Sequence, residues 1–119
     1  MSVKAYDWIA NHAYRTPDKV ASVDLLSERR LTYGEMHRRV GRLAQFLRQS
    51  LGIEPGDRIA LLARNTTDTF DLQFACQRLG AIMMPLNWRL AEPELEFILS
   101  DSTPKLLIYD DHFADAAEA

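Results

Sequence analysis

Cysteine and glycine are scarce in this sequence of 119 residues, which contains one cysteine and five glycines. The single Cys76 cannot form an intramolecular disulfide, and its apolar neighbours fit a buried residue in a reducing compartment. The glycines stand apart, and no two of them complete a GxGxxG or GxxxxGK[ST] phosphate-binding loop. The glycines therefore provide no backbone cradle for a nucleotide.

Long hydrophobic runs and a strong net charge are also missing. No apolar run approaches the roughly 20 residues that span a bilayer, and the first residues lack a signal-peptide pattern. A net charge of −3, with 26% charged residues, creates no field that would attract nucleic acid or anionic lipid. We therefore expect a soluble, cytoplasmic protein with no transmembrane segment and no nucleic-acid partner.

Hydrophobic residues make up 47% of the sequence, which is enough for one domain with a modest core. "DWIANHAYR" has apolar residues at helical spacing, and Thr16-Pro17-Asp18 is expected to end that helix. "VASVDLLSERRLTY" predicts a β-hairpin with a charged tip. Thr32 and Glu35 form a capping-box pattern, which predicts a long helix with an apolar stripe that ends near Gly52.

The following residues alternate between continuous apolar strands and amphipathic helices. "RIALLA", "AIMMPL" and "KLLIYD" are the predicted strands, and the helices between them are "NTTDTFDLQFACQRLG", opened by Asn65, and "AEPELEFILSDS". This pattern predicts an α/β fold with a mostly parallel sheet covered by helices. We expect a single domain over 1–119, with a helix and hairpin over 1–31, a long helix and β-α-β-α-β over 32–109, and a tail over 110–119 that starts another helix.

Ligands of parallel sheets bind beyond the carboxyl ends of the strands. Those ends are 64–66, 87–89 and 110–112, and the most informative group is Asn87, Trp88 and Arg89. An arginine can bind phosphate or carboxylate, and an indole can stack on a base or an acyl chain. The alternative is structural: Arg89 caps carbonyls or pairs with Glu92, while Trp88 fills a groove between helices.

Other reactive residues do not form a recognisable site. The histidines are far apart and lack metal-ligand spacing, and the Ser/Asp pairs lack a nucleophile elbow. The arginine-rich segment "HRRVGRLAQFLR" alternates with an apolar stripe, as a solvated helix face does. We therefore predict neither a metal site nor a catalytic residue among this group: His12, His37, His112, Ser22 with Asp24, Ser100 with Asp101, Cys76, Lys19 and Lys105.

Five segments in order resemble the amino-terminal part of the adenylate-forming (AMP-binding) superfamily, in particular acyl-CoA synthetases. They are "RTPDKVA", "RLTYGEMHRRVGRLAQFL", "GIEPGDRIALLARN", "FACQRLGAIMMPLNWRL" and "ELEFILSDSTPKLLI", and the resemblance runs from about Tyr6 to Tyr109. It implies the first subdomain of a large N-terminal domain. It also implies a ligase that uses ATP and Mg²⁺ to make an acyl-adenylate, transfers the acyl group to coenzyme A, and serves fatty acid metabolism.

The resemblance carries one site residue over to this sequence. The family's Ser/Thr/Gly-rich phosphate loop, its acidic ATP motif, its hinge aspartate and its catalytic lysine match no residue here. "PLNWRL" resembles the family's "PLNPRL"-like loop, with Trp88 where proline is common. The arginine of that loop lies near the nucleotide phosphates of coenzyme A in the CoA ligases, which implies a cofactor-binding role for Arg89.

Two hypotheses follow from the sequence. In the first, the chain is a fragment of an ATP-dependent acyl-CoA synthetase, inactive alone and expected to self-associate or to need the rest of its parent. In the second, it is a complete, non-catalytic interaction module built on an adenylation-type subdomain. A carboxylic acid is the implied substrate, and both fatty and aryl acids remain open because the resemblance places the acyl pocket in later segments.

Overall fold

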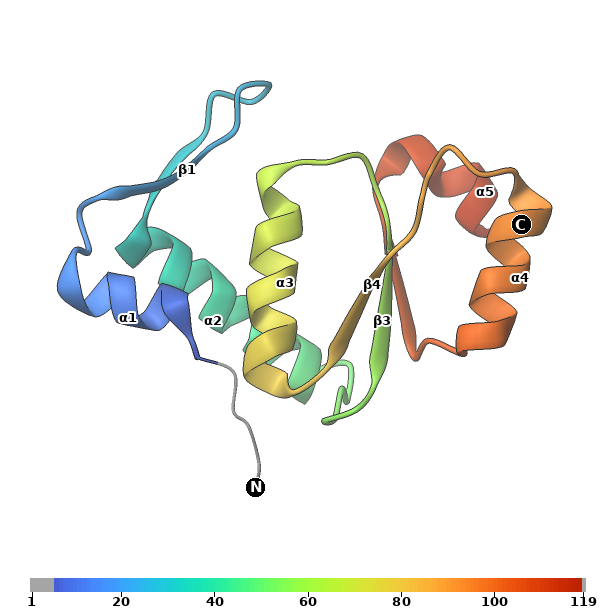
Figure 1. Cartoon of the computed structure of the whole chain (residues 1–119), viewed down its shortest axis with the longest axis horizontal. Helices are drawn as coiled ribbons and strands as arrows, with labels where there is room; N and C mark the ends of the chain where they lie inside the picture. Colours follow the sequence, from blue (N-terminus) through green and yellow to red (C-terminus); the bar gives the residue numbers. More distant parts are fainter. Residues whose placement is uncertain (1–5, 119) are drawn as a thin grey trace.

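The computed structural model describes residues 6–118 and has the predicted α/β architecture (Figure 1). In chain order the elements are α1 (Trp8–Arg15), β1 (Val20–Val23), β2 (Arg30–Thr32), α2 (Tyr33–Gln49), β3 (Arg58–Leu62), α3 (Thr67–Leu79), β4 (Ile82–Pro85), α4 (Glu92–Ser102), β5 (Leu106–Tyr109), the 3₁₀ turn η1 (Asp111–Phe113) and α5 (Ala114–Glu118).

The first two elements after α1 form the predicted hairpin, because β1 and β2 pair antiparallel. Asp7 caps α1 by accepting a hydrogen bond from the Ala10 amide at 3.0 Å. Asp24 organises the hairpin tip in the same way, since its Oδ1 accepts from the Leu26 and Ser27 amides at 3.0 and 3.2 Å. The hairpin extends beyond the body formed by the helices (Figure 1).

The long helix α2 begins with the predicted capping box. The Thr32 hydroxyl accepts from the Glu35 amide, and the Glu35 carboxylate accepts from the Thr32 amide. The stripe that α2 buries consists of Met36, Val40, Ala44 and Leu47, with Leu43 partly buried beside it. The helix ends at Gln49, earlier than predicted, and Gly52 lies beyond its cap with φ of 66°.

The three predicted strands form one parallel sheet in the order β4-β3-β5. Ile59 is in register with Met83 on one side and with Leu106 on the other. β3 is therefore the central strand. This arrangement confirms the predicted fold class.

The helices between the strands are those predicted, with one correction at the start of α3. Thr66, and not Asn65, is the N-cap, because the extended Thr66 backbone lets its hydroxyl accept a hydrogen bond from the Asp68 amide. Gly80 ends α3 in the left-handed conformation with φ of 71°. Pro93 occupies the first turn of α4, where its missing amide hydrogen costs no helical hydrogen bond.

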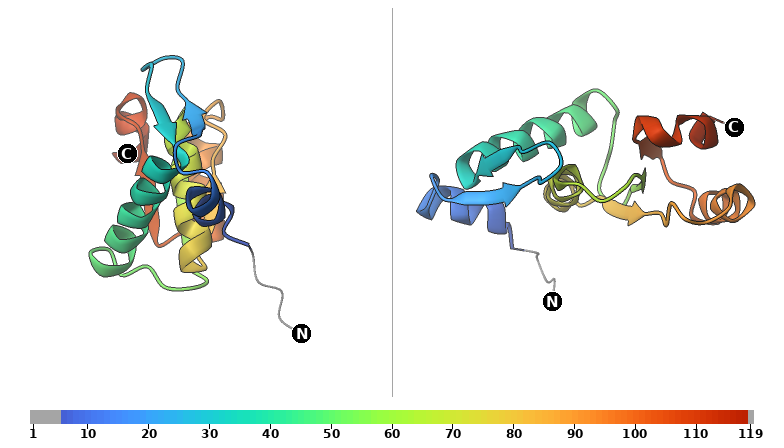
Figure 2. Two further views of the ribbon diagram at one scale, coloured as in Figure 1. Left: turned by 90° about the vertical axis from the view of Figure 1, so that its left-hand side faces the viewer. Right: turned by 90° about the horizontal axis from the view of Figure 1, so that it is seen from above.

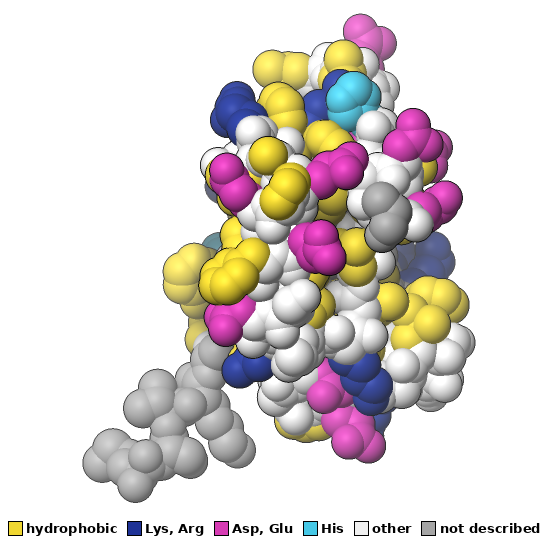
Figure 3. Space-filling view, turned by 90° about the vertical axis from the view of Figure 1, so that its right-hand side faces the viewer, with side chains coloured by type: hydrophobic (Ala, Val, Ile, Leu, Met, Phe, Trp, Pro, Cys, Tyr) yellow, Lys and Arg dark blue, Asp and Glu magenta, His cyan; other side chains and the backbone are white. Residues whose placement is uncertain are grey.

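The sheet carries helices on both faces, with α2 and α3 on one side and α4 and α5 on the other (Figures 1 and 2). Ile59 and Leu61 belong to the larger core cluster with α1, α2 and α3. The alternate residues Ala60 and Leu62 pack with Leu86 and with Leu95 of α4. On the outer α4 and α5 side, hydrophobic and acidic side chains are interspersed (Figure 3). Among residues 6–118, no helix combines the length and the apolar character needed to cross a bilayer.

The turn between α3 and β4 gives a testable stability prediction. A Cβ on Gly80 would lie 3.3 Å from the Pro55 Cβ, whereas a Cβ on Gly52 would meet nothing within 4 Å. Both glycines have positive φ. We therefore expect Gly80→Ala to lower the free energy of unfolding by about 2 kcal/mol, and Gly52→Ala by about 1 kcal/mol, the second reflecting backbone strain alone. Urea denaturation measures both values, and equal losses would mean that the Pro55 turn moves aside freely.

Candidate functional site

The loops that follow the three parallel strands meet at one edge of the sheet, as predicted. Asp110, after β5, connects to the loop after β3: its Oδ2 accepts a hydrogen bond from the Arg64 amide at 3.3 Å and lies 3.9 Å from the Arg64 Nε. Asp110 also caps the 3₁₀ turn by accepting from the His112 amide at 2.8 Å. One carboxylate thus holds two of the three loops together.

The loop after β4 presents Arg89 at the same edge. The guanidinium carbon of Arg89 lies 4.6 Å from the centre of the Trp88 ring, within cation–π distance. The Asn87 Oδ1 accepts a hydrogen bond from the Arg89 amide at 3.1 Å, which fixes the backbone of this turn. Within residues 6–118 the Arg89 side chain makes no ion pair, so the predicted alternative of a pair with Glu92 is absent there.

An aromatic side chain that the sequence did not single out supports Trp88. The Phe113 ring lies 5.9 Å from the Trp88 ring, and His112 meets Phe113 edge-on at 4.8 Å. Trp88 is half-buried and Arg89 is exposed. The indole is therefore held between an aromatic neighbour and a guanidinium whose N–H groups face no protein anion in the described structure. Such a cation suits a phosphate or carboxylate ligand.

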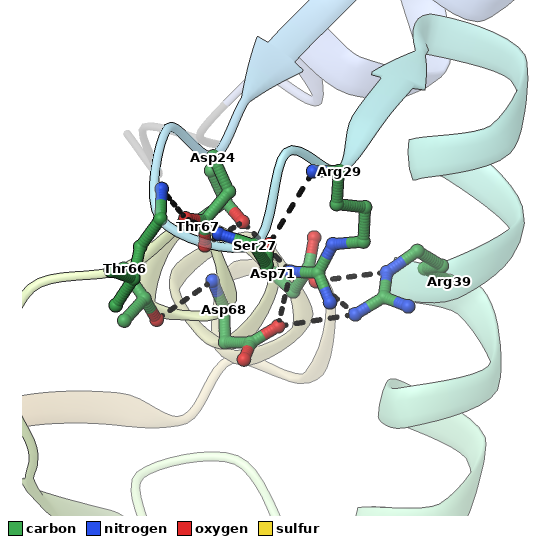
Figure 4. A network of polar contacts seen from close by, with 9 residues as sticks. Asp24, Ser27, Arg29, Arg39, Thr66, Thr67, Asp68 and Asp71 are labelled. Atoms are coloured by element: carbon green, nitrogen blue, oxygen red, sulfur yellow. Dashed lines mark hydrogen bonds and ion pairs between the residues drawn. The ribbon is translucent and has the colours of Figure 1, made fainter.

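A second polar cluster joins the hairpin, α2 and the start of α3 (Figure 4). Arg39 of α2 donates two hydrogen bonds to the Asp71 Oδ2, at 3.1 and 2.9 Å. Arg29 of the hairpin donates to the Thr67 hydroxyl and to the Asp68 carboxylate, both at 2.7 Å. We refer to Asp24, Arg29, Arg39, Thr67, Asp68 and Asp71 as the hairpin–helix network.

Burial sets the electrostatics of this network. The Asp71 side chain is only 6% exposed, and this burial raises the pKa of its carboxyl group even though Arg39 favours the charged form. Its Oδ1 has no hydrogen-bond partner in the described structure. At the hairpin tip, the Ser27 amide, helped by other donors, lowers the pKa of Asp24. The network therefore positions the hairpin, α2 and α3 relative to one another through ion pairs and hydrogen bonds. Each of its side chains makes at least one of these contacts, so we assign none of them as a nucleophile.

The sequence alone predicts ordinary roles for these residues. Its local pattern places Arg39 on a solvated helix face and makes Asp24, with Ser22, a strand or cap residue. Arg39 and Asp71 are 32 positions apart, and Arg29 and Asp68 are 39 apart, so no local pattern connects them. One signal was present: Asp71 lies among the apolar residues of a predicted helix, where an acid usually has a partner.

A pocket of about 530 Å³ lies between α2, α3 and the ends of β3 and β5. Its floor is aliphatic, and arginine and aspartate side chains from both helices and from the strand ends surround it. We call it the α2–α3 groove. Its lining residues are Arg39, Arg42, Leu43, Leu61, Ala63, Arg64, Thr66, Asp68, Thr69, Asp71, Leu72, Ile108, Tyr109 and Asp110.

The histidines occupy separate places. His12 stacks with Tyr33 at 4.8 Å, and the His37 Nδ1 lies 2.7 Å from the Arg78 Nη2. Over residues 6–118, no group of three or more His, Cys, Asp or Glu side chains could hold a metal ion.

The cysteine and Lys105 also have structural surroundings. Burial raises the pKa of the Cys76 thiol to about 11, which leaves it unreactive at neutral pH. Lys105 bonds to the Gly52 carbonyl and pairs with Asp57 at 3.2 Å at the amino end of the sheet. Neither residue lies at the edge that carries Arg89.

Comparisons with known proteins identify relatives of this chain. The family model described as AMP-binding enzyme matches residues 9–119. The long-chain-fatty-acid–CoA ligase FadD13 of Mycobacterium tuberculosis is 40% identical over 108 residues, which are 90% of this chain and 21% of that protein. The chain therefore spans about one fifth of the length of this curated relative.

Solved structures show the same likeness. The N-terminal domain of FACL13 from Mycobacterium tuberculosis superimposes with a TM-score of 0.90 at 38% identity, over 98% of this chain and 29% of that one. O-succinylbenzoate coenzyme A synthetase (MenE) from Bacillus subtilis, in complex with ATP and magnesium ion, gives a TM-score of 0.83 at 28% identity, over 93% of this chain and 30% of that one.

The hairpin–helix network predicts a stability loss when Arg39 is removed. Arg39→Met should lower the free energy of unfolding by about 2–3 kcal/mol at neutral pH, because Asp71 is left as a buried charge without its partner. The matched control is Arg42→Met, on the same helix and the same groove. In residues 1–119 alone it should change the value by less than about 0.5 kcal/mol, because Arg42 has no ion-pair partner among the described residues.

The pH dependence of this loss has a defined sign. A carboxyl group whose pKa is raised in the folded state binds protons more tightly there than in the unfolded chain, so acid favours folding at this site. Arg39 lowers the pKa of Asp71 in the wild type, so its removal raises the pKa further, and the deficit of Arg39→Met should shrink as the pH falls toward the ordinary aspartate value of about 3.9. Denaturant unfolding of both variants between neutral and acidic pH measures it, and a deficit that grew in acid would contradict the assignment to Asp71.

Proposed function

Because this chain belongs to the AMP-binding enzyme family, we propose that it is the N-terminal portion of an ATP-dependent acyl-CoA synthetase. The complete protein activates a carboxylic acid as an acyl-adenylate and then transfers the acyl group to coenzyme A. The observation that carries the proposal is the agreement of residues 9–119 with the family model, together with the likeness to the FACL13 N-terminal domain over nearly the whole chain.

Arg89 is the residue to which we give a ligand-binding role, as a contact for a phosphate of coenzyme A. Its guanidinium is exposed at the carboxyl edge of the sheet and is held over the Trp88 ring. Fixing the cation before the ligand arrives reduces the conformational entropy that binding would otherwise remove. The N–H groups at the rim of the guanidinium remain available, and they suit the paired oxygens of a phosphate.

ATP and Mg²⁺ enter the proposal through the family, and MenE is one member solved with both. The described residues fit them poorly, because they include neither a metal-ligand cluster nor adjacent glycines in a phosphate loop. We therefore assign these two cofactors to other parts of the complete protein. We also propose that the complete protein acts in the cytoplasm. The proposal includes both fatty and aryl acids as substrates, since FadD13 is named for a long-chain fatty acid and MenE for O-succinylbenzoate.

The alternative is a small protein that uses the subdomain as a non-catalytic interaction module. The polar edge around Arg64, Asp110 and Arg89 could then bind a partner without chemistry. The complete reading frame of the gene separates the two. A frame that continues into a Ser/Thr/Gly-rich loop supports the synthetase, and a stop codon after Ala119 supports the module.

The role of Arg89 can be tested in the protein made from the complete reading frame. Arg89→Ala should raise the KM for coenzyme A by about 10- to 100-fold, which corresponds to about 1–3 kcal/mol for one charge-assisted contact. Acyl-adenylate formation, measured by acid-dependent pyrophosphate exchange, should stay within about twofold of the wild type. Equal losses in both half-reactions, or no change in either, would leave Arg89 with a structural role.

Trp88 provides a control for that experiment. Trp88→Phe keeps an aromatic face under the guanidinium, so it should weaken coenzyme A use less than Trp88→Ala does. If the indole acts by holding Arg89, Trp88→Ala should have little further effect in the Arg89→Ala background. Trp8→Phe, at an exposed tryptophan on α1, is the matched variant that should leave both half-reactions unchanged.

We expect residues 1–119 alone to show no pyrophosphate exchange with ATP, magnesium and a panel of fatty and aryl acids. Phosphoryl chemistry needs cations and amide donors around the charged oxygens, and the described residues provide no loop that supplies them. Self-association or marginal stability of this isolated chain is also expected, because the α2–α3 groove leaves aliphatic surface uncovered. Exchange above background by the purified chain would reveal an active site within it.

A further inference from the structure

The α2–α3 groove lies where the sheet stops. β5 pairs with β3 along one edge, and within residues 6–118 no strand pairs with its other edge. Two lining residues, Ile108 and Tyr109, belong to this outer strand. The groove therefore joins an open strand edge to an aliphatic floor, a combination that a stable domain normally covers.

The floor of the groove is apolar, and one cation on its rim has no ion-pair partner within residues 6–118. Leu61 and Leu72 are buried below it, and Leu43 and Ile108 are partly buried beside them. Arg39 is committed to Asp71, whereas Arg42, one turn further along α2, is exposed and makes no ion pair in the described part of the chain. A fitting occupant has aliphatic side chains for the floor and a carboxylate for Arg42.

The buried carboxylate adds one more requirement. Asp71 lines the groove, its side chain is 6% exposed, and its Oδ1 accepts no hydrogen bond from the described residues. A buried acceptor without a donor is costly. An occupant that also brings an N–H or O–H group to this oxygen would remove that cost.

We propose that the α2–α3 groove is the docking surface for a later segment of the same polypeptide, a segment with aliphatic side chains, a carboxylate that pairs with Arg42 and a donor for Asp71. The FACL13 N-terminal domain superimposes on this chain over 98% of its length, yet the chain covers only 29% of that domain. More polypeptide is therefore arranged around the same scaffold in that relative. The inference rests on the proposed function in that it takes this chain to be part of a longer family member.

A tethered segment fits these observations better than a small ligand or a second copy. A pocket of about 530 Å³ is large enough for a small molecule, but it is lined in part by β5, whose outer edge has no partner strand within residues 6–118. A small molecule cannot extend the sheet along that edge. A segment of the same chain also binds at a high effective concentration, so it does not depend on protein concentration as a second copy does.

Cysteine labelling in the complete protein tests the proposal without requiring activity. Thr69 lines the groove and is partly buried on α3, so Thr69→Cys places a thiol at its wall. Gln45→Cys, at an exposed α2 position that does not line the groove, is the matched control. The native Cys76 is buried and its thiol has a pKa of about 11, so its iodoacetamide labelling reports unfolding and not surface exposure.

The expected result is that Thr69→Cys in the complete protein reacts with iodoacetamide at least about 100-fold more slowly than Gln45→Cys, at every protein concentration. Arg42→Glu, which places a like charge against the docked carboxylate, should raise the Thr69→Cys rate at least about fivefold while Cys76 stays unlabelled.

Three results would overturn the proposal: labelling of Thr69→Cys at the control rate, protection that disappears on dilution, or protection unaffected by Arg42→Glu. The second of these would indicate a second copy. Acid-dependent pyrophosphate exchange by the unlabelled complete protein decides the proposed function separately, because labelling does not depend on catalysis. Protection of Thr69→Cys in a protein without ligase activity would keep the docking surface and reject the synthetase.

Discussion

The burial of β3 on both faces is the constraint on which the rest of the structure depends. Ile59 and Ala60 are fully buried, and they face opposite core clusters. A strand covered in this way needs helices on both sides of the sheet, and parallel neighbours need helical crossovers to provide them. The places of α3, α4 and the loops at the carboxyl edge all follow from this one requirement.

The hairpin–helix network extends that framework to the N-terminal elements. Arg29 connects the hairpin to α3 through its hydrogen bond to Asp68, and Arg39 connects α2 to α3 through its hydrogen bond to Asp71. In the Arg39–Asp71 pair the carboxylate is buried, and a buried ion pair seldom increases stability over apolar packing but does restrict how the elements it joins can be arranged. The network lies beside the first turn of α3, which directly follows the Arg64 loop, so it also fixes the orientation of one side of the carboxyl edge.

The elements of the fold could be predicted because their signals are local. Thr32 and Glu35 are three residues apart, and Gly80 directly follows its helix. The sequence could not show that Thr66 is the N-cap of α3 in place of the predicted Asn65. Both side chains can cap a helix, and the backbone conformation determines which of them does so. Arg39 and Asp71, like Trp88 and Phe113, meet only after the chain folds, so the sequence could place Trp88 and Arg89 at the edge but could not show what supports them.

The carboxyl edge also explains why one basic side chain can matter in a region with so few functional groups. Arg64 is close to Asp110, which reduces its attraction for an incoming anion, whereas Arg89 rests on an uncharged ring and keeps its full charge for a ligand. Proline in the place of Trp88 would give Arg89 no aromatic face to lie on. The tryptophan therefore holds the long, flexible Arg89 side chain in one direction, and this effect does not depend on which anion is the proposed ligand.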